Sequence, residues 1–310
     1  MQPIALTRRR FGRHTLSTLG VYDTHVSFVA GQAGYVHQIK LAGRDLLWNY
    51  DDGEALDAND GYRALALLPF PNRLLEGRYT WDGRALELPV NMPDTRSAIH
   101  GIGSDARFRV DRLDLETDRA AARLTYLHTP DMHPRGYPFL VRFDLALGID
   151  VRAAAASWDL RATNLGPGSA PVGLGWHPYF ALPGGAEAWR VAMPPNRRVE
   201  MERAIPTGRL GPGLPAGHPL PVDDAWDDCF KLDDSSDRTV RLESESYSVV
   251  LSQSGDTSYT QLYVPPDSPA VAVEPMTCGV NAFAAEPDEV ALPSGATVST
   301  RVDISLGEPR

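Results

Sequence analysis

Val141-Arg142-Phe143-Asp144-Leu145-Ala146-Leu147 places an apolar side chain at every second position. Because successive side chains of a strand point to opposite faces, this period of two predicts a strand with one face in the core. No long stretch keeps the spacing of an amphipathic helix. We therefore predict an all-β protein, a large antiparallel β-sandwich with few short helices. The same alternation spans residues 36–41, 108–115, 124–127, 158–161, 240–243 and 298–306.

Length and composition limit the possible functions. The 310 residues carry a formal net charge of -10 and show no internal repeat, so we expect a single domain over residues 1–310. An acidic chain without a dominant basic face is expected to bind neither nucleic acid nor membranes, and a neutral polar ligand suits it better. Its two cysteines are too few for a disulfide scaffold, which favours a reducing, cytoplasmic setting. The sequence does not distinguish a monomer from a homodimer.

We also make predictions for three other segments of the chain. Thr7-Arg8-Arg9-Arg10-Phe11 is similar to the start of a twin-arginine export signal, but polar residues follow where such a signal needs an apolar run. We therefore expect no export signal, and no apolar run reaches membrane-spanning length. Residues 59–72 are expected to form a strand. Residues 193–223 contain seven prolines, and we expect a long surface loop over one edge of the sandwich.

The segment from Gly173 to Phe180 contains the histidine best suited to proton transfer. Pro178 removes a backbone donor, so the segment is not expected to be an uninterrupted strand. Histidine titrates near neutral pH, and the rings of Trp176 and Tyr179 could stack on the face of a sugar. From the residues alone, His177 could equally well be a core histidine whose ring nitrogens form hydrogen bonds with the backbone.

Other polar clusters interrupt apolar runs in the same way. They are Asn72-Arg73, His100-Gly101 and Glu274, which closes the run Val271-Ala272-Val273. A buried carboxylate is costly unless it is solvated, paired or protonated. Glu274 therefore either faces a cleft or forms a structural ion pair with an arginine. Asp227-Asp228 belongs either to a site or to a solvated turn.

Sequence signatures of several other kinds of site are missing. There is no His-Glu-x-x-His and no Cys-x-x-Cys, and the segment from His128 to His133 is typical of a turn. Neither a Gly-x-Ser-x-Gly elbow nor a glycine-rich phosphate loop is present. We therefore expect a site without a metal and without a cofactor.

Taken together, these segments resemble the aldose 1-epimerase (galactose mutarotase) family. The resemblance follows the family's order through most of the chain and implies the family's fold, the galactose mutarotase-like super-sandwich. It is carried by Asn72-Arg73-Leu74, His100-Gly101, Gly136-Tyr137-Pro138, His177-Pro178-Tyr179-Phe180, Pro206-Thr207-Gly208, Asp227 with Phe230, and Glu274-Pro275.

The resemblance implies an isomerase that interconverts the α and β anomers of a free aldohexose, with a monosaccharide as its partner. Glu274 would be the general base and His177 the general acid, on opposite sides of the sugar's C1–O5 bond. Nearby carboxylates are expected to keep His177 protonated. The implied substrate-binding residues are Arg73, His100, Asp227 and Asn72.

Two other functions remain open from the residues themselves. One is a non-catalytic carbohydrate-binding or sugar-sensing protein on the same fold. The presence of both an acid and a base favours the enzyme over this alternative. The other is an epimerase of an anionic hexose, sulfonated or phosphorylated. An anion-binding arginine could come from Arg63, Arg73, Arg78 or Arg96.

Overall fold

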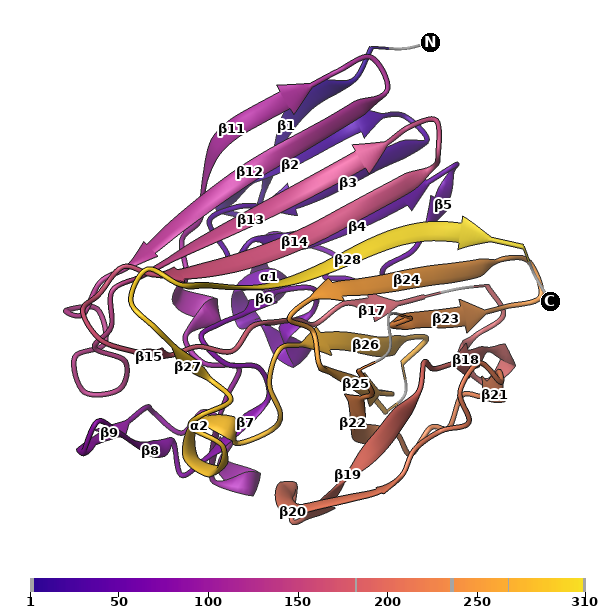
Figure 1. The fold of residues 1–310 in the computed structure, drawn as a ribbon. Coiled ribbons are helices and arrows are strands. Elements are labelled where there is room, and N and C mark those ends of the chain that lie inside the picture. The colour runs from indigo at the N-terminus through magenta and orange to yellow at the C-terminus, as the bar shows by residue number, and fades with distance from the viewer. Residues whose placement is uncertain (1–2, 182, 235–236, 267, 309–310) are drawn as a thin grey trace.

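The computed structural model describes residues 3–181, 183–234, 237–266 and 268–308, and antiparallel strands make up most of it (Figure 1). A nine-stranded sheet forms one layer of the molecule. Its strands follow in the order β11 (Arg109–Leu115), β12 (Arg119–His128), β13 (Val141–Asp150), β14 (Ala155–Asn164), β28 (Thr297–Gly307), β24 (Ser248–Gly255), β23 (Thr239–Glu243), β18 (Arg190–Ala192) and β21 (Leu220–Pro221).

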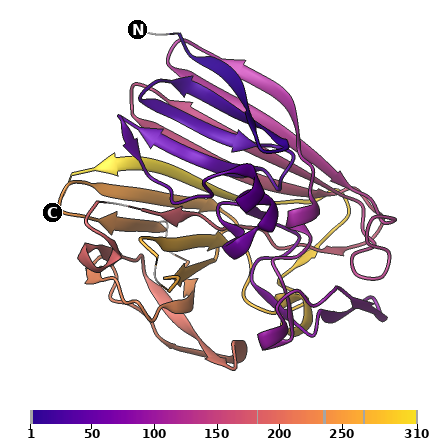
Figure 2. The ribbon, with the colours of Figure 1, turned by 180° about the vertical axis from the view of Figure 1, so that it is seen from behind.

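Two further sheets pack against this layer, as the view from behind also shows (Figure 2). The first is five-stranded, with β1 (Ala5–Phe11), β2 (His14–Val21), β3 (Thr24–Val29), β4 (Tyr35–Leu41) and β5 (Arg44–Asp45). The second is eight-stranded, in the order β20 (Ile205–Pro212), β19 (Asn196–Glu202), β22 (Asp227–Leu232), β25 (Tyr259–Tyr263), β26 (Val271–Met276), β16 (Gly175–Trp176) and β6 (Ala66–Leu67), with β17 (Tyr179–Phe180) also paired to β26.

Short elements complete the described part of the chain. The α-helices found there are α1 (Gly53–Ala58) and α2 (Ala282–Ala285). With six and four residues, neither could reach across a lipid bilayer. Three two-stranded sheets pair β7 (Arg73–Leu75) with β10 (Ser97–Ile99), β8 (Arg78–Trp81) with β9 (Arg84–Glu87), and β15 (Ala170–Pro171) with β27 (Ala291–Leu292).

Side-chain alternation explains how the layers meet. On β13, Phe143, Leu145 and Leu147 are buried, while Arg142 is exposed. The core between the nine-stranded and eight-stranded sheets includes Trp158 of β14 and Trp176 of β16, whose rings stack with centroids 5.1 Å apart. The prediction of an all-β antiparallel sandwich with few short helices is confirmed, and every alternating segment lies on a strand.

Two local predictions were wrong. Residues 59–72 contain a 3₁₀ turn, Asp60–Tyr62, and only the two-residue strand β6, because left-handed backbone at Gly61, Tyr62 and Ala64 interrupts the extended chain. The proline-rich stretch 193–223 is not one long loop. Most of it forms the hairpin β19–β20, with its prolines tolerated because β20 is an edge strand. The arginine-rich segment at residues 8–10 lies in β1.

Candidate active site

A cavity of about 640 Å³ is lined in part by strands β22, β25 and β26 of the eight-stranded sheet. Its size is within the range of small-molecule sites and exceeds what a single hexose needs. The structure brings all of the sequence-predicted site residues to its wall: Asn72, Arg73, His100, His177, Asp227 and Glu274. Segments separated by as many as 202 residues, from position 72 to position 274, thus converge on one cavity.

Strand β26 positions the two groups that can move protons. Glu274 lies near the middle of this strand, and only 2% of its surface is exposed. The short strands β16 and β17 both pair with β26, and the residues between them, His177 and Pro178, interrupt the ladder. Because Pro178 has no N–H, the chain bends here, and the backbone N–H of His177 donates instead to the carbonyl of Leu65. The predicted break in the strand is confirmed.

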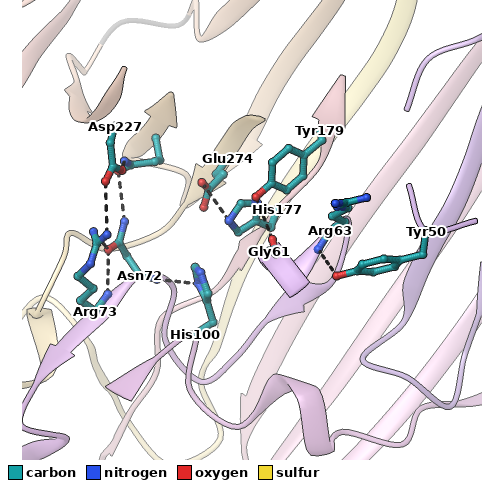
Figure 3. Close-up of polar contacts among 11 residues, drawn as sticks. Tyr50, Gly61, Arg63, Asn72, Arg73, His100, His177, Tyr179, Asp227 and Glu274 are labelled. Carbon is teal, nitrogen blue, oxygen red and sulfur yellow. Dashed lines mark hydrogen bonds and ion pairs between the residues drawn. The ribbon is translucent and has the colours of Figure 1, made fainter. Parts of the chain in front are cut away.

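Glu274 and His177 contact each other directly (Figure 3). His177 Nε2 lies 3.4 Å from Glu274 Oε1, and both side chains are almost completely buried. Among the described residues, His177 Nδ1 and Glu274 Oε2 are buried without a hydrogen-bond partner. Buried polar atoms are rarely left in this state, and those that are often belong to functional sites. The two groups are thus side by side, not on opposite sides of a sugar-sized gap.

Burial controls the charge of this pair. It lowers the pKa of His177 to about 3 and raises the pKa of Glu274 well above its usual value. The negative charge of Asp227 raises the Glu274 pKa further, and Arg73 partly opposes it. Burial therefore favours the neutral form of each group, an uncharged imidazole and a protonated carboxyl group. The expectation that nearby carboxylates keep His177 protonated was wrong, because burial lowers the pKa of the ring.

Asn72 and His100 fix each other at the wall of the cavity. The backbone N–H of Asn72 donates to His100 Nδ1 over 3.1 Å, and the backbone N–H of His100 donates to the Asn72 carbonyl over 2.9 Å. Since Nδ1 accepts, neutral His100 carries its proton on Nε2, where it can be donated to a ligand. Burial, His177 and Arg73 lower the pKa of His100 well below its usual value, so the ring stays neutral.

The backbone at this contact is strained. Asn72 and His100 both have φ of 59°, in the left-handed region that non-glycine residues avoid. Gly101 follows with φ of 63°, and a Cβ atom there would lie 2.4 Å from the carbonyl oxygen of Leu68. Only glycine fits this position. Such strain persists where surrounding contacts enforce it, and it is common at functional sites.

We predict that Gly101→Ala destabilises the protein by at least about 1–3 kcal/mol, because it adds a backbone clash to a strained φ. Gly43→Ala is the matched control, since Gly43 has φ of 79° but open space around the position of a Cβ atom. The measurement is the loss of thermal stability of each variant. Equal losses of thermal stability in the two variants would contradict a clash at Gly101. The loss would then come from the positive φ alone.

An ion pair and two hydrogen bonds connect Asn72, Arg73, Asp227 and Gln261 on the cavity wall. Arg73 Nη2 lies 3.3 Å from Asp227 Oδ2, and Gln261 Nε2 donates to Asp227 Oδ1 over 2.7 Å. Asn72 Nδ2 in turn donates to Gln261 Oε1 over 3.2 Å. Gln261 was not predicted as a site residue, because no motif or break in an apolar run distinguishes it in the sequence. In the structure it lies opposite Glu274, in the register by which β25 pairs with β26.

Strand alternation separates the two adjacent aspartates. Asp227 lines the cavity, whereas Asp228 lies outside it, 3.9 Å from Arg198.

The two aromatic neighbours of His177 also differ in whether they line the cavity. The Tyr179 ring stacks on His177 with centroids 4.9 Å apart and lines the cavity, but Trp176 is buried against Trp158. The expectation that Trp176 could stack on a sugar was therefore wrong.

Metal ligation is not suggested by the arrangement of side chains. Within the part of the chain that the structure describes, no group of three or more His, Cys, Asp or Glu side chains is placed to hold an ion. His128 and His133 do lie together, with Nε2 of one and Nδ1 of the other 3.1 Å apart. This pair lies outside the residues that line the cavity.

The antiparallel sandwich is similar to that of known proteins. The chain is 26% identical over 288 residues to the uncharacterized protein YihR of Escherichia coli strain K12, covering 90% of this chain and 89% of that protein. It is similar in structure to a galactose mutarotase-like protein from Clostridium acetobutylicum, with a TM-score of 0.87 and 16% identity over 99% of each chain. A galactose 1-epimerase from Lactobacillus acidophilus NCFM gives a TM-score of 0.84 and 14% identity over 100% of each chain.

The family itself is defined by sequence. The family model for aldose 1-epimerase matches residues 29–305, which is most of the chain. The protein therefore belongs to the aldose 1-epimerase family, and the resemblance seen in its sequence segments is confirmed. Its β-sandwich is the galactose mutarotase-like fold.

Proposed function

We propose that this protein is a mutarotase that interconverts the α and β anomers of a free aldohexose by opening and closing the sugar ring. The observation that carries the proposal is the direct contact between His177 Nε2 and Glu274 Oε1, 3.4 Å apart on the wall of the cavity. The hydroxyl and the ring oxygen that must exchange protons are bonded to the same carbon, C1. An acid and a base in contact with each other can therefore reach both of these atoms.

The pair needs only one proton for the whole cycle. When a sugar binds, the proton passes from Glu274 to His177 across their contact; Glu274 then accepts the proton of the C1 hydroxyl while His177 donates its proton to the ring oxygen O5. The C1–O5 bond breaks and the C1–O1 bond becomes a carbonyl. Now Glu274 is protonated and His177 is neutral, which are the forms that burial favours. Rotation about C1–C2 followed by the reverse transfers gives the other anomer, without exchange of protons with water.

The remaining polar groups would hold the other hydroxyls of the sugar. His100 offers an Nε2–H donor, and Arg73 offers guanidinium donors beside the half-exposed acceptor Asp227. Asn72 and Gln261 connect these groups, so their positions are fixed before a sugar arrives. Preorganised donors and acceptors reduce the entropy that binding would otherwise cost.

Polarimetry or NMR exchange on freshly dissolved anomers tests the proposal. We expect the protein to accelerate the approach to anomeric equilibrium for at least one member of a panel of neutral and anionic aldohexoses, relative to buffer alone. Acceleration for none of them would contradict the mutarotase. Binding without acceleration would instead indicate a carbohydrate-binding or sensing protein.

The shifted pKa values predict an unusual pH profile. The pair keeps its single proton above the His177 pKa of about 3 and below the raised pKa of Glu274. Below this window the pair gains a second proton and has no base; above it, the pair has no proton and thus no acid. We expect kcat/KM, corrected for the buffer reaction, to fall on the acid side only near pH 3 and on the alkaline side only at the raised pKa of Glu274. An acid-side fall centred near the ordinary glutamate pKa of about 4.3 would show instead that burial does not shift the two groups.

A further inference from the structure

The cavity has a second end, which the proposed ring opening does not use. Arg63 lines this end and lies on the other side of His177 from Arg73 (Figure 3). Its guanidinium lies over the ring of Trp48, with Cζ 3.5 Å from the ring centroid. Nη1 also donates a long hydrogen bond of 3.4 Å to the carbonyl of Asn49. The arginine side chain is therefore held in place largely by an aromatic face.

The backbone of Arg63 is fixed relative to the acid–base pair. Its N–H donates to the Tyr50 hydroxyl over 3.2 Å, and the N–H of the next residue, Ala64, donates to the carbonyl of His177 over 2.7 Å. Tyr62 and Ala64, on either side, have left-handed φ values of 54° and 51°. This strained backbone, joined to that of His177 by the Ala64 hydrogen bond, fixes the point from which the Arg63 side chain extends.

The Arg63 guanidinium has no ion-pair partner among the described residues. Among the residues that the structure describes, no carboxylate lies within 4.0 Å of the Arg63 guanidinium, not even that of Asp60, which also lines the cavity. Arg73, by contrast, is already paired with Asp227 at 3.3 Å. A guanidinium stacked on a ring keeps its in-plane N–H donors available, and these match the geometry of an anionic oxygen group.

We propose that the substrate of this cavity is an aldose carrying an anionic oxygen group, which Arg63 binds. The inference rests on the proposed mutarotase activity, because it uses the orientation that activity gives to the sugar. If His177 donates to O5, the ring atom beyond O5 is C5, which carries C6. A substituent at C6 thus extends along the His177 side of the cavity, toward Arg63. Carboxylate, phosphate and sulfonate groups share the required chemistry.

The test compares kcat/KM for anomeric exchange of glucose with that of its C6 carboxylate, C6 phosphate and C6 sulfonate counterparts. We expect at least one anion to exceed glucose by about tenfold or more, the size of one hydrogen-bonded charge contact. The anion with the highest kcat/KM identifies which anionic group the cavity prefers. In Arg63→Gln the ratio of anionic to neutral kcat/KM should fall to about one, and Arg63→Lys should restore part of it.

Arg44→Gln is the matched control, because the Arg44 guanidinium also lies over an aromatic ring, that of Tyr247, with Cζ 5.0 Å from its centroid. Arg44 is outside the residues that line the cavity, and its loss should leave the ratio unchanged. Thermal unfolding verifies that all variants are folded. A ratio near one in the unmodified protein, or a ratio that survives Arg63→Gln, would overturn the proposal.

A binding measurement separates this inference from the proposed function. 1,5-Anhydroglucitol and its C6 anionic forms have no C1 hydroxyl and cannot open, so calorimetric titration with them reports binding alone. If no sugar is turned over, the mutarotase proposal fails, and these titrations still decide the role of Arg63. Tighter binding of an anion that depends on Arg63 would support it. Equal affinities for neutral and anionic forms would refute it.

Discussion

Glu274→Gln is expected to lower kcat for anomeric exchange by about 10²–10⁴-fold, the usual contribution of a positioned general base. The amide keeps the shape of the side chain but cannot accept the proton of the C1 hydroxyl. Sugar affinity should change much less, because Arg73, His100 and Asp227 remain. The measurement is the first-order rate of anomer exchange at saturating sugar, after subtraction of the buffer rate.

Loss of folded protein is not expected to explain the lower rate of Glu274→Gln. The folded protein raises the pKa of Glu274, so the unfolded chain releases this proton at a lower pH than the folded one. The group therefore costs stability as the pH rises above the unfolded pKa of about 4.3, and this cost is absent from the glutamine variant. Glu274→Gln should unfold at the same or a higher temperature at neutral pH.

Asp228→Asn is the matched control for the loss of a carboxylate. Asp228 lies next to Asp227 on β22 but outside the cavity, so its change should leave kcat within about twofold. If Glu274→Gln retained the full rate, Glu274 could not be the base. If Asp228→Asn lost as much activity as Glu274→Gln, the loss would reflect general disturbance of β22 and its neighbours.

Much of the fold was predictable because strand alternation is local information. Segments such as residues 141–147 and 298–306 show their buried faces directly in the order of their side chains. The site was predictable for a different reason. Asn72, His100, His177 and Glu274 each interrupt an apolar run, and their common order matches the family. Neither signal depends on knowing which strands pair.

Other features could not be found this way, because they depend on partners distant in the sequence. Gln261 belongs to the site only because β25 pairs with β26 in the register that places it opposite Glu274. The hairpin β19–β20 was hidden by prolines that an edge strand accepts and a central strand would not. The charge of His177 depends on burial, which a one-dimensional pattern of charges does not reveal.

His177→Asn is expected to lower kcat by a similar factor, about 10²–10⁴-fold, because the shorter amide places no protonated group at the ring oxygen. Folding should be retained, because burial favours the neutral forms of both His177 and Glu274, so removing the imidazole does not remove the partner of a buried charge. Circular dichroism and thermal unfolding are the controls. An unchanged exchange rate would remove His177 from the mechanism and leave Glu274 as the only proton-transfer group.

Combining Glu274→Gln with His177→Asn gives the sharper test of a shared proton. Independent groups would multiply their effects, which predicts a combined loss of about 10⁴–10⁸-fold. If one proton moves between the two groups in every cycle, either substitution already disables both transfers. The double variant should then be no more than about tenfold slower than the slower single variant. Multiplicative losses would contradict the shared proton and indicate that acid and base act separately.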